Sequence, residues 1–170
     1  MSTAEHKMQA PKAVNCKVVT VSDTRDRTTD KSGQLMMELL TQAGHKVVDY
    51  CIVKDEMEPI RAEILNGSER EDVDVILTNG GTGIAKRDVT IETVQILLDK
   101  EMPGFGEIFR MLSYQEDIGS AAILSRAAAG VINNKAIFST PGSSGAVRLA
   151  MTKLILPELG HVVRELKKDL

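Results

Sequence analysis

The sequence predicts an α/β protein with one domain, a three-layer αβα sandwich around a mostly parallel sheet. Short runs rich in β-branched residues alternate along the chain with longer runs in which apolar residues recur at helical spacing. Strands that alternate with helices imply right-handed crossovers and a parallel sheet that helices cover on both faces. The 170 residues, 42% of them hydrophobic, are enough for one packed core.

The first half of the chain repeats strand and helix after a polar beginning. Residues 1–13 show no periodicity, so we expect a flexible tail there and a single domain over residues 14–170. Leu35 and Leu39 recur on one helical face, and Gly44 supplies the stop signal. We expect, in order, a strand at 16–21, a polar loop at 22–29, a helix from 30 to the stop at 44, a strand at 46–53, a helix at 57–66 and a strand at 73–78.

The second half continues the alternation with less regular segments. Alanines concentrated between residues 121 and 129 favour a closely packed helix. Leu156, Leu159 and Val163 form an apolar stripe at helical spacing, and Pro157 is tolerated in the first turn of that helix. We expect, in order, a helix at 90–98, helix-like stretches at 108–116 and 120–129, a strand at 136–140, a helical turn at 146–151 and a last helix at 154–167.

Composition argues against several classes of partner. The formal charge of −3, the 3% aromatic content and the lack of Trp disfavour a nucleic-acid partner. No apolar run approaches the roughly 18 residues of a membrane span, and the polar start does not resemble a signal peptide, so we expect a cytoplasmic protein with no membrane partner. The two cysteines lack metal-site spacing and the three histidines are scattered, which favours structural thiols and predicts no zinc site.

A glycine-rich loop is the most informative local feature. Gly80, Gly81, Thr82 and Gly83 follow a predicted strand and precede a predicted helix. Three glycines in four positions let backbone N–H groups crowd around an anion that side chains would otherwise exclude. The spacing matches neither the Walker loop nor the dinucleotide fingerprint. A capped turn is the alternative, so the loop alone does not decide for a phosphate site.

A second loop of small residues follows the strand at 136–140. Its sequence is Pro141, Gly142, Ser143 and Ser144, and it leads into a predicted helix N-terminus, where an anion is favoured. In an open parallel sheet, ligands bind at the carboxyl ends of the strands, where these loops meet. We therefore expect two phosphate-binding loops at one edge of the sheet.

Acidic residues follow the strands at the same edge. Ser22 and Asp23 end the first strand, Asp55 follows the second, and Asp88 closes the glycine loop. A carboxylate beside a phosphate repels it unless a cation lies between them, which favours Mg²⁺. For each aspartate taken singly, loop or cap chemistry is an equally good interpretation.

Six ordered motifs together resemble the molybdopterin-binding MoaB/Mog family of molybdenum-cofactor biosynthesis. They are Ser22-Asp23, Lys54-Asp55-Glu56, residues 79–90, residues 102–107, residues 122–126 and Pro141-Gly142-Ser143. The resemblance runs from about residue 14 to the C-terminus. It implies a compact αβα domain that assembles as a homotrimer or homohexamer and binds molybdopterin. It also implies transfer of AMP from ATP to the terminal phosphate of molybdopterin, and contacts with other proteins of the pathway.

The resemblance also implies roles for individual residues. Asp55 and Asp88 match the family's catalytically important carboxylates, and would hold Mg²⁺ with ATP. The residues that match its ligand-binding loops and neighbouring motifs are Ser22, Asp23, Gly80, Gly81, Thr82, Gly83, Thr90, Glu107, Pro141, Gly142, Ser143 and Ser144. One departure is the segment 84–86, which replaces a more proline-rich spacing found in some adenylyltransferases of the family.

Two other functions remain open at this point. The first is a molybdopterin-binding or scaffold protein of the same pathway that keeps the loops without catalysis. The second is a hydrolase or isomerase of small phosphorylated metabolites on a similar sheet, against which the loops offer no His base or Cys nucleophile.

Overall fold

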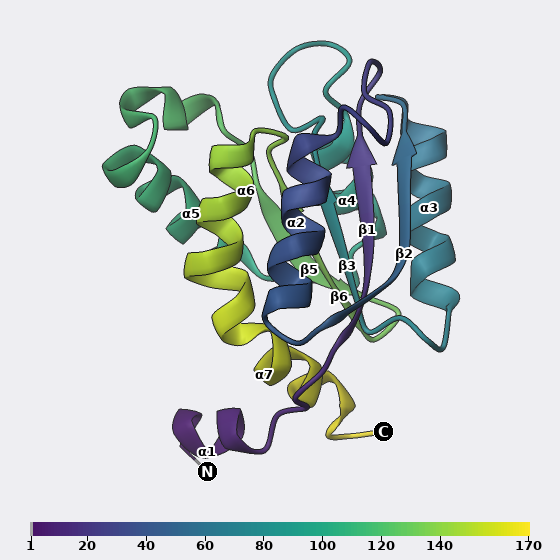
Figure 1. Ribbon diagram of the computed structural model, residues 1–170, viewed down its shortest axis with the longest axis vertical. Coiled ribbons are helices and arrows are strands. Elements are labelled where there is room, and N and C mark those ends of the chain that lie inside the picture. The colour runs from purple at the N-terminus through teal and green to yellow at the C-terminus, as the bar shows by residue number, and fades with distance from the viewer. Residues whose placement is uncertain (1) are drawn as a thin grey trace.

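The computed structural model describes residues 2–170 as alternating strands and helices (Figure 1). The elements are α1 Thr3–Met8, β1 Asn15–Val21, α2 Lys31–Gln42, β2 Lys46–Val53, α3 Met57–Glu69, β3 Val75–Asn79, α4 Thr90–Leu97, β4 Lys100–Glu101, α5 Pro103–Glu116, the 3₁₀ helix η1 Gly119–Leu124, β5 Ala128–Ile132, β6 Lys135–Thr140, α6 Ser144–Ala150, the π-helix η2 Met151–Ile155 and α7 Leu156–Lys167. No helix in this described part of the chain is long and apolar enough to cross a membrane.

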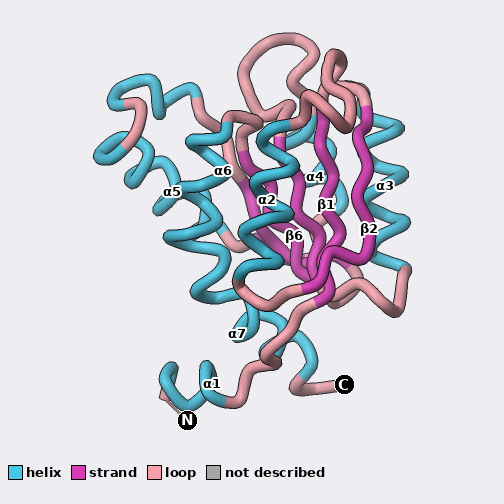
Figure 2. The backbone as a smooth tube through the Cα atoms, viewed as in Figure 1, coloured by secondary structure: helices cyan, strands magenta, loops and turns pink. Residues whose placement is uncertain are grey.

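A six-stranded sheet of order β2-β1-β3-β6-β5-β4 forms the middle layer (Figure 2). The four strands β2, β1, β3 and β6 are parallel, whereas β5 and β4 add an antiparallel edge. Apolar side chains from α2, α5, α6 and α7 pack against one face, and those from α3 and α4 pack against the other. The predicted three-layer αβα architecture is confirmed.

The central strands are buried on both faces, which explains their near-continuous apolar sequences. Val18 and Leu77 contribute to the core under α2 and α6, while Val19 and Ile76 contribute to the core under α3. All four side chains are 0% exposed. Neighbouring residues of one strand therefore pack against opposite helical layers. The loops that follow β1, β2, β3 and β6 lie together at the carboxyl ends of these strands.

The helix predicted over residues 120–129 is wrong in its second half. The 3₁₀ helix ends at Leu124, and the alanines at 128 and 129 begin strand β5. Asn133 and Asn134 have positive φ values of 47° and 61°, which suit a two-residue hairpin between β5 and β6. Pairing across that hairpin overrides the helical preference of alanine.

The N-terminal segment contains a short helix that the sequence pattern does not predict. Ser2 and Glu5 form a capping box at the start of α1. Lys7 Nζ lies 2.5 Å from Glu158 Oε1 on α7, and Arg164 Nη2 donates to Gln9 Oε1 at 2.8 Å. The segment thus packs on the C-terminal helix. The flexibility expected for residues 1–13 stays a prediction.

Candidate functional site

A cleft of about 380 Å³ opens at the carboxyl edge of the parallel strands. It lies where the loops after β1, β2, β3 and β6 meet, at the end toward which the arrowheads of β1 and β2 point in Figure 1. Its lining residues are Val21, Ser22, Thr24, Arg25, Asp55, Gly80, Gly81, Thr82, Gly83, Asp88, Leu124, Ser125, Pro141 and Gly142. The sheet therefore brings both predicted loops and both predicted carboxylates to one cleft.

The glycine loop needs its glycines for close backbone packing. Gly80 has a φ of 97°, and a Cβ there would lie 2.2 Å from the carbonyl oxygen of Val21. Gly81 has a φ of 68°, a left-handed conformation that side chains disfavour. A Cβ on Gly142 would lie 3.0 Å from the Cα of Gly80, so the two loops are in contact.

The backbone of this loop offers donors to a ligand. Thr90 fixes the base of the loop, because its Oγ1 donates to Gly80 O at 2.9 Å and its N–H donates to Gly81 O at 3.0 Å. Among residues 2–170, no protein acceptor is paired with the N–H groups of Gly81, Thr82 and Gly83. Successive free N–H groups in such a turn form an anion-binding concavity.

Asp23 and Asp55 hold their two loops together by reciprocal hydrogen bonds. Asp23 N–H donates to Asp55 Oδ2 at 3.0 Å, and Asp55 N–H donates to Asp23 Oδ1 at 3.1 Å. Arg87 binds Asp23 through two hydrogen bonds of 2.6 and 2.9 Å, and these hold the Asp23 pKa below its ordinary value. Burial, the Asp23 charge and the Asp88 charge raise the Asp55 pKa, although the Asp23 N–H and Arg87 act against the shift.

Asp88 packs against the glycine loop at Gly83 and lines the cleft. Its Oδ2 accepts a hydrogen bond from Ala85 N–H at 3.0 Å, and a Cβ on Gly83 would lie 2.7 Å from the same oxygen. This contact matches the capping interpretation, and it leaves Oδ1 for a ligand. Asp55 likewise uses Oδ2 in the loop contact.

The donor set fits Mg²⁺ only with help from a ligand. Within residues 2–170, the three aspartates do not bring three ligand atoms within 4.8 Å of one another. Mg²⁺ is commonly bound by one or two carboxylates together with substrate phosphates and water. One oxygen each from Asp55 and Asp88 suits that mode, in which the ligand's phosphates would complete the coordination of the ion.

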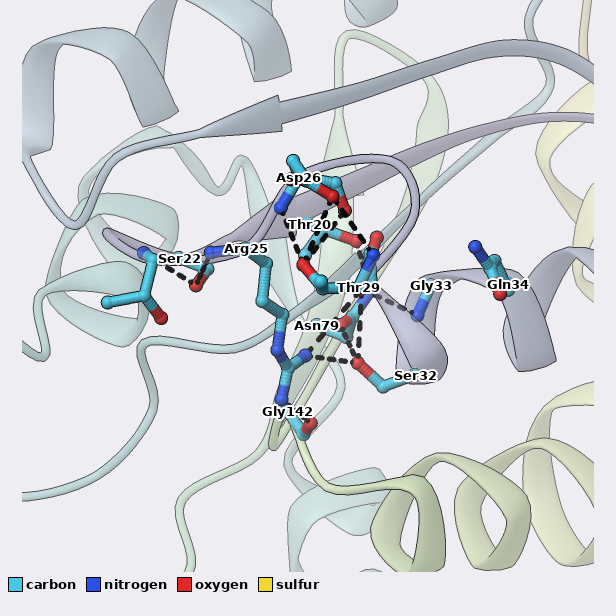
Figure 3. Close-up of polar contacts among 12 residues, drawn as sticks. Thr20, Ser22, Arg25, Asp26, Thr29, Ser32, Gly33, Gln34, Asn79 and Gly142 are labelled. Atoms are coloured by element: carbon cyan, nitrogen blue, oxygen red, sulfur yellow. Dashed lines mark hydrogen bonds and ion pairs between the residues drawn. The ribbon is translucent and has the colours of Figure 1, made fainter.

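Arg25 is a cleft residue that the sequence pattern does not single out. The turn at Ser22 places it, because Ser22 Oγ accepts the N–H groups of Thr24 and Arg25. Its Nη2 donates to Gly142 O at 2.8 Å and its Nη1 donates to Ser32 Oγ at 2.5 Å (Figure 3). Arg25 thus ties the loop after β1 to the loop after β6, and it brings to the cleft a positive charge that the buried Asp30, 3.6 Å from Nη1, partly offsets. Its contact with Gly142 spans 117 residues of the sequence, so no local pattern could have indicated it.

Arg126 supports the glycine loop through hydrogen bonds to its carbonyl groups. It donates to the carbonyl oxygens of Thr82 at 3.0 Å and Gly83 at 2.7 Å, and more weakly to that of Asp88 at 3.3 Å. It also forms an ion pair with Glu92, which lowers the pKa of that carboxyl. Arg126 falls within the motif at residues 122–126, but the sequence gives it no individual role. Its contacts are to carbonyl groups 38 to 44 residues away, and such contacts leave no local sequence pattern.

The other predicted site residues lie around the cleft or in a second hollow, and none of them lines the cleft. Asp23 adjoins the cleft, Thr90 is buried beneath it, and Ser143 caps α6 by accepting the Ala146 N–H at 3.1 Å. Ser144, the first residue of α6, is exposed, and neither serine lines the cleft. Glu107 lies in a second hollow, also of about 380 Å³, between α5 and the segment 125–128. Ser125 lines both hollows.

An αβα domain with two small-residue loops and two carboxylates at the carboxyl edge of its sheet belongs to the class of open-sheet α/β proteins, which bind their ligands at that edge. Within that class, the chain belongs to the family described as "Probable molybdopterin binding domain", which it matches over residues 17–161. The predicted resemblance is confirmed.

Similar proteins cover nearly the whole chain. A "Molybdenum cofactor biosynthesis protein B" from Bacillus cereus is 68% identical over 169 residues, 99% of this chain and 100% of its own. A crystal structure of a "Molybdenum cofactor biosynthesis protein B" superposes with a TM-score of 0.91 at 68% identity, over 94% of this chain and 99% of that one. The "tungsten cofactor synthesizing protein MoaB" of Pyrococcus furiosus has a TM-score of 0.82 at 38% identity, over 93% of this chain and 99% of its own.

Proposed function

We propose that this protein binds molybdopterin in the cleft and transfers AMP from ATP to its terminal phosphate, as a step of molybdenum cofactor biosynthesis. The names of its relatives support the pathway. One observation carries the chemistry: two glycine-containing loops touch at Gly80 and Gly142, with the carboxylates of Asp55 and Asp88 beside them. We place the reaction in the cytoplasm, where ATP is supplied.

The reaction suits a site without a nucleophilic side chain. A phosphate oxygen of molybdopterin attacks the α-phosphorus of ATP, a new P–O–P bond forms, and pyrophosphate leaves. The protein must hold two anions in line, which is the principal task in catalysis of phosphoryl and nucleotidyl transfer. Backbone N–H groups of Gly81 and Gly83 and the guanidinium of Arg25 are the donors that would orient phosphates.

Asp55 and Asp88 would hold the magnesium ion. When bound, the ion offsets negative charge on the phosphates and on the leaving pyrophosphate. Burial and the neighbouring carboxylates raise the pKa of Asp55, so its ionisation costs more free energy in the folded protein than in the unfolded chain. A cation that arrives with the nucleotide would relieve that cost, so ATP and the metal should bind cooperatively.

A binding or scaffold role in the same pathway is the chief alternative. It needs the loops and the N–H groups but not the carboxylates. A phosphate-ester hydrolase or isomerase is a weaker candidate, because no histidine and no cysteine among residues 2–170 lines the cleft.

The test is incubation of the protein with molybdopterin, ATP and Mg²⁺, followed by quantification of AMP-molybdopterin and pyrophosphate. Equal amounts of both products support adenylyl transfer. Tight binding of molybdopterin without either product supports the scaffold role. Release of inorganic phosphate without AMP-molybdopterin supports a hydrolase.

We also propose that the chain assembles as a homotrimer or homohexamer through α5 and η1, which project from the body of the domain (Figure 1). Several large apolar side chains are exposed there: Ile108 45%, Met111 49%, Tyr114 61%, Ile118 46%, Ile123 84% and Leu124 50%. An exposed apolar patch of this kind marks an interaction surface. Light scattering should report a trimer or hexamer for the wild type and a smaller species for the double variant Met111→Asp/Ile123→Asp, whereas a monomeric wild type contradicts the proposal.

A further inference from the structure

A histidine of the N-terminal helix meets a histidine and a glutamate of the C-terminal helix, which lie more than 150 residues further along the chain. His6 lies on α1, and His161 and Glu165 lie on α7. Their candidate ligand atoms all lie within 4.8 Å of one another, and the two imidazole rings meet edge to face with centroids 5.5 Å apart. His161 and Glu165 are four residues apart on one helix, which places both on the same face. Sequence spacing alone predicts no such cluster, because His6 reaches it only through the packing of α1 on α7.

The surrounding contacts orient these groups as a metal site requires. His161 Nδ1 lies 3.0 Å from Glu158 Oε2, an arrangement that leaves Nε2 to a ligand. Metal-bound histidines commonly use their second ring nitrogen in this way, with a carboxylate that fixes the tautomer. Lys7 holds the other oxygen of Glu158 at 2.5 Å, and Lys168 holds Glu165 Oε2 at 2.7 Å.

The side chains are ordered by partners yet accessible to an ion. The exposed fractions of the His6, His161 and Glu165 side chains are 25%, 21% and 33%. His6 Nδ1 lies 3.2 Å from Glu165 Oε1, a contact that a bound ion would replace. Arg164 Nη1 also contacts that oxygen, at 3.0 Å, and would have to share it or move.

We propose that His6, His161 and Glu165 form a zinc-binding site distinct from the cleft. Two imidazole nitrogens, one carboxylate oxygen and a water molecule make a four-coordinate set that Zn²⁺ accepts. The site lies near the end of the domain opposite the cleft, where α1 approaches α7 (Figure 1). Because the ligands come from both helices, a bound ion fastens the N-terminal segment to the C-terminal helix.

The test measures binding and its structural consequence on the full-length protein. Calorimetric titration with Zn²⁺ should give one ion per chain, and Co²⁺ should give a four-coordinate absorption spectrum without a thiolate charge-transfer band. Hydrogen exchange of the amides of residues 3–9 should slow on addition of Zn²⁺, because the ion fixes α1 to α7.

Variants test whether zinc binding and the slower hydrogen exchange of α1 depend on the proposed ligands. His6→Ala and His161→Ala should each abolish the one-to-one binding and the protection of α1, and Glu158→Ala should weaken binding about tenfold by freeing the imidazole of His161. His45→Gln removes the remaining histidine and should bind as the wild type does. Wild-type protein that binds no zinc, binding unchanged in His161→Ala, or binding without slower exchange in α1 would each overturn the proposal.

Discussion

Replacement of Gly81 by alanine tests whether the glycine loop is as tightly constrained as its geometry indicates. A Cβ at this position would lie 2.3 Å from Thr90 Oγ1 and 2.9 Å from Asp55 Oδ1. The left-handed backbone, with a φ of 68°, costs an alanine about 1–2 kcal/mol. Displacement of Thr90 breaks its hydrogen bond to Gly80 O and adds about 1 kcal/mol or more.

The expected loss of unfolding free energy for Gly81→Ala is therefore about 2–4 kcal/mol. For a domain of this size, that loss lowers Tm by roughly 5–15 °C. Molybdopterin affinity should fall about 10- to 100-fold, because a hydrogen bond to a charged phosphate is worth about 1.5–3 kcal/mol.

Two other glycines separate the cost of backbone strain from the cost of the steric clash with Thr90. Gly44 has a φ of 89° with nothing within 4 Å of its Cβ position, so Gly44→Ala reports the backbone strain alone. Gly104 has neither a left-handed φ nor a neighbour within 4 Å, so Gly104→Ala should change stability by less than about 1 kcal/mol. Thermal unfolding and molybdopterin titration of all three variants give the comparison. If Gly81→Ala is no less stable than Gly44→Ala and binds molybdopterin normally, the loop accommodates a side chain at this position and is not tightly constrained.

Two further predictions concern charged residues around the cleft. Arg126→Ala removes the donors to the carbonyl groups of Thr82 and Gly83, so it should lower the unfolding free energy by about 1–3 kcal/mol and raise the Kd for molybdopterin. Chemical denaturation measures the first effect and ligand titration the second. An unchanged Kd would show that the loop keeps its shape without this support. Asp55 has a raised pKa, so the folded protein binds this proton more tightly than the unfolded chain, and the ionised carboxylate lowers stability as pH rises above its ordinary pKa of 3.8. Asp55→Asn should consequently be at least as stable as the wild type at pH 7, with the difference vanishing in acid, and a variant that is clearly less stable at pH 7 would contradict the direction of the shift.

The parallel half of the fold could be predicted because its signals are local. The strand from Lys46 to Val53 and the helix that starts at Met57 follow directly from apolar spacing and flanking breakers. The antiparallel edge could not, since β4 has only two residues, Lys100 and Glu101, and the alanines of β5 favour a helix in isolation. Pairing with β6 decides the conformation of β5, and β4 in turn pairs with β5.

The cleft was predictable where a residue follows directly from a strand end. Asp55 and Gly142 reach it for that reason, because parallel strands end at one edge. Arg25 and Arg126 act through carbonyl groups distant in sequence, and such contacts have no sequence signature. Glu107 is the opposite case: its motif matches the family and predicts a site residue, but α5 places it in a neighbouring hollow outside the cleft.

Paired measurements of binding and turnover on Asp55→Asn and Asp88→Asn decide whether the two carboxylates serve AMP transfer. Asparagine preserves the size of each side chain and an oxygen that can accept the Asp23 or Ala85 N–H, but removes the charge that a magnesium ion needs. Molybdopterin affinity should stay near the wild-type value while the rate of AMP transfer falls roughly 100-fold or more, since metal stabilisation of the transition state is worth several kcal/mol. Equal loss of affinity and rate would mean that the two aspartates shape the loops, and a wild-type rate in both variants would remove them from the mechanism.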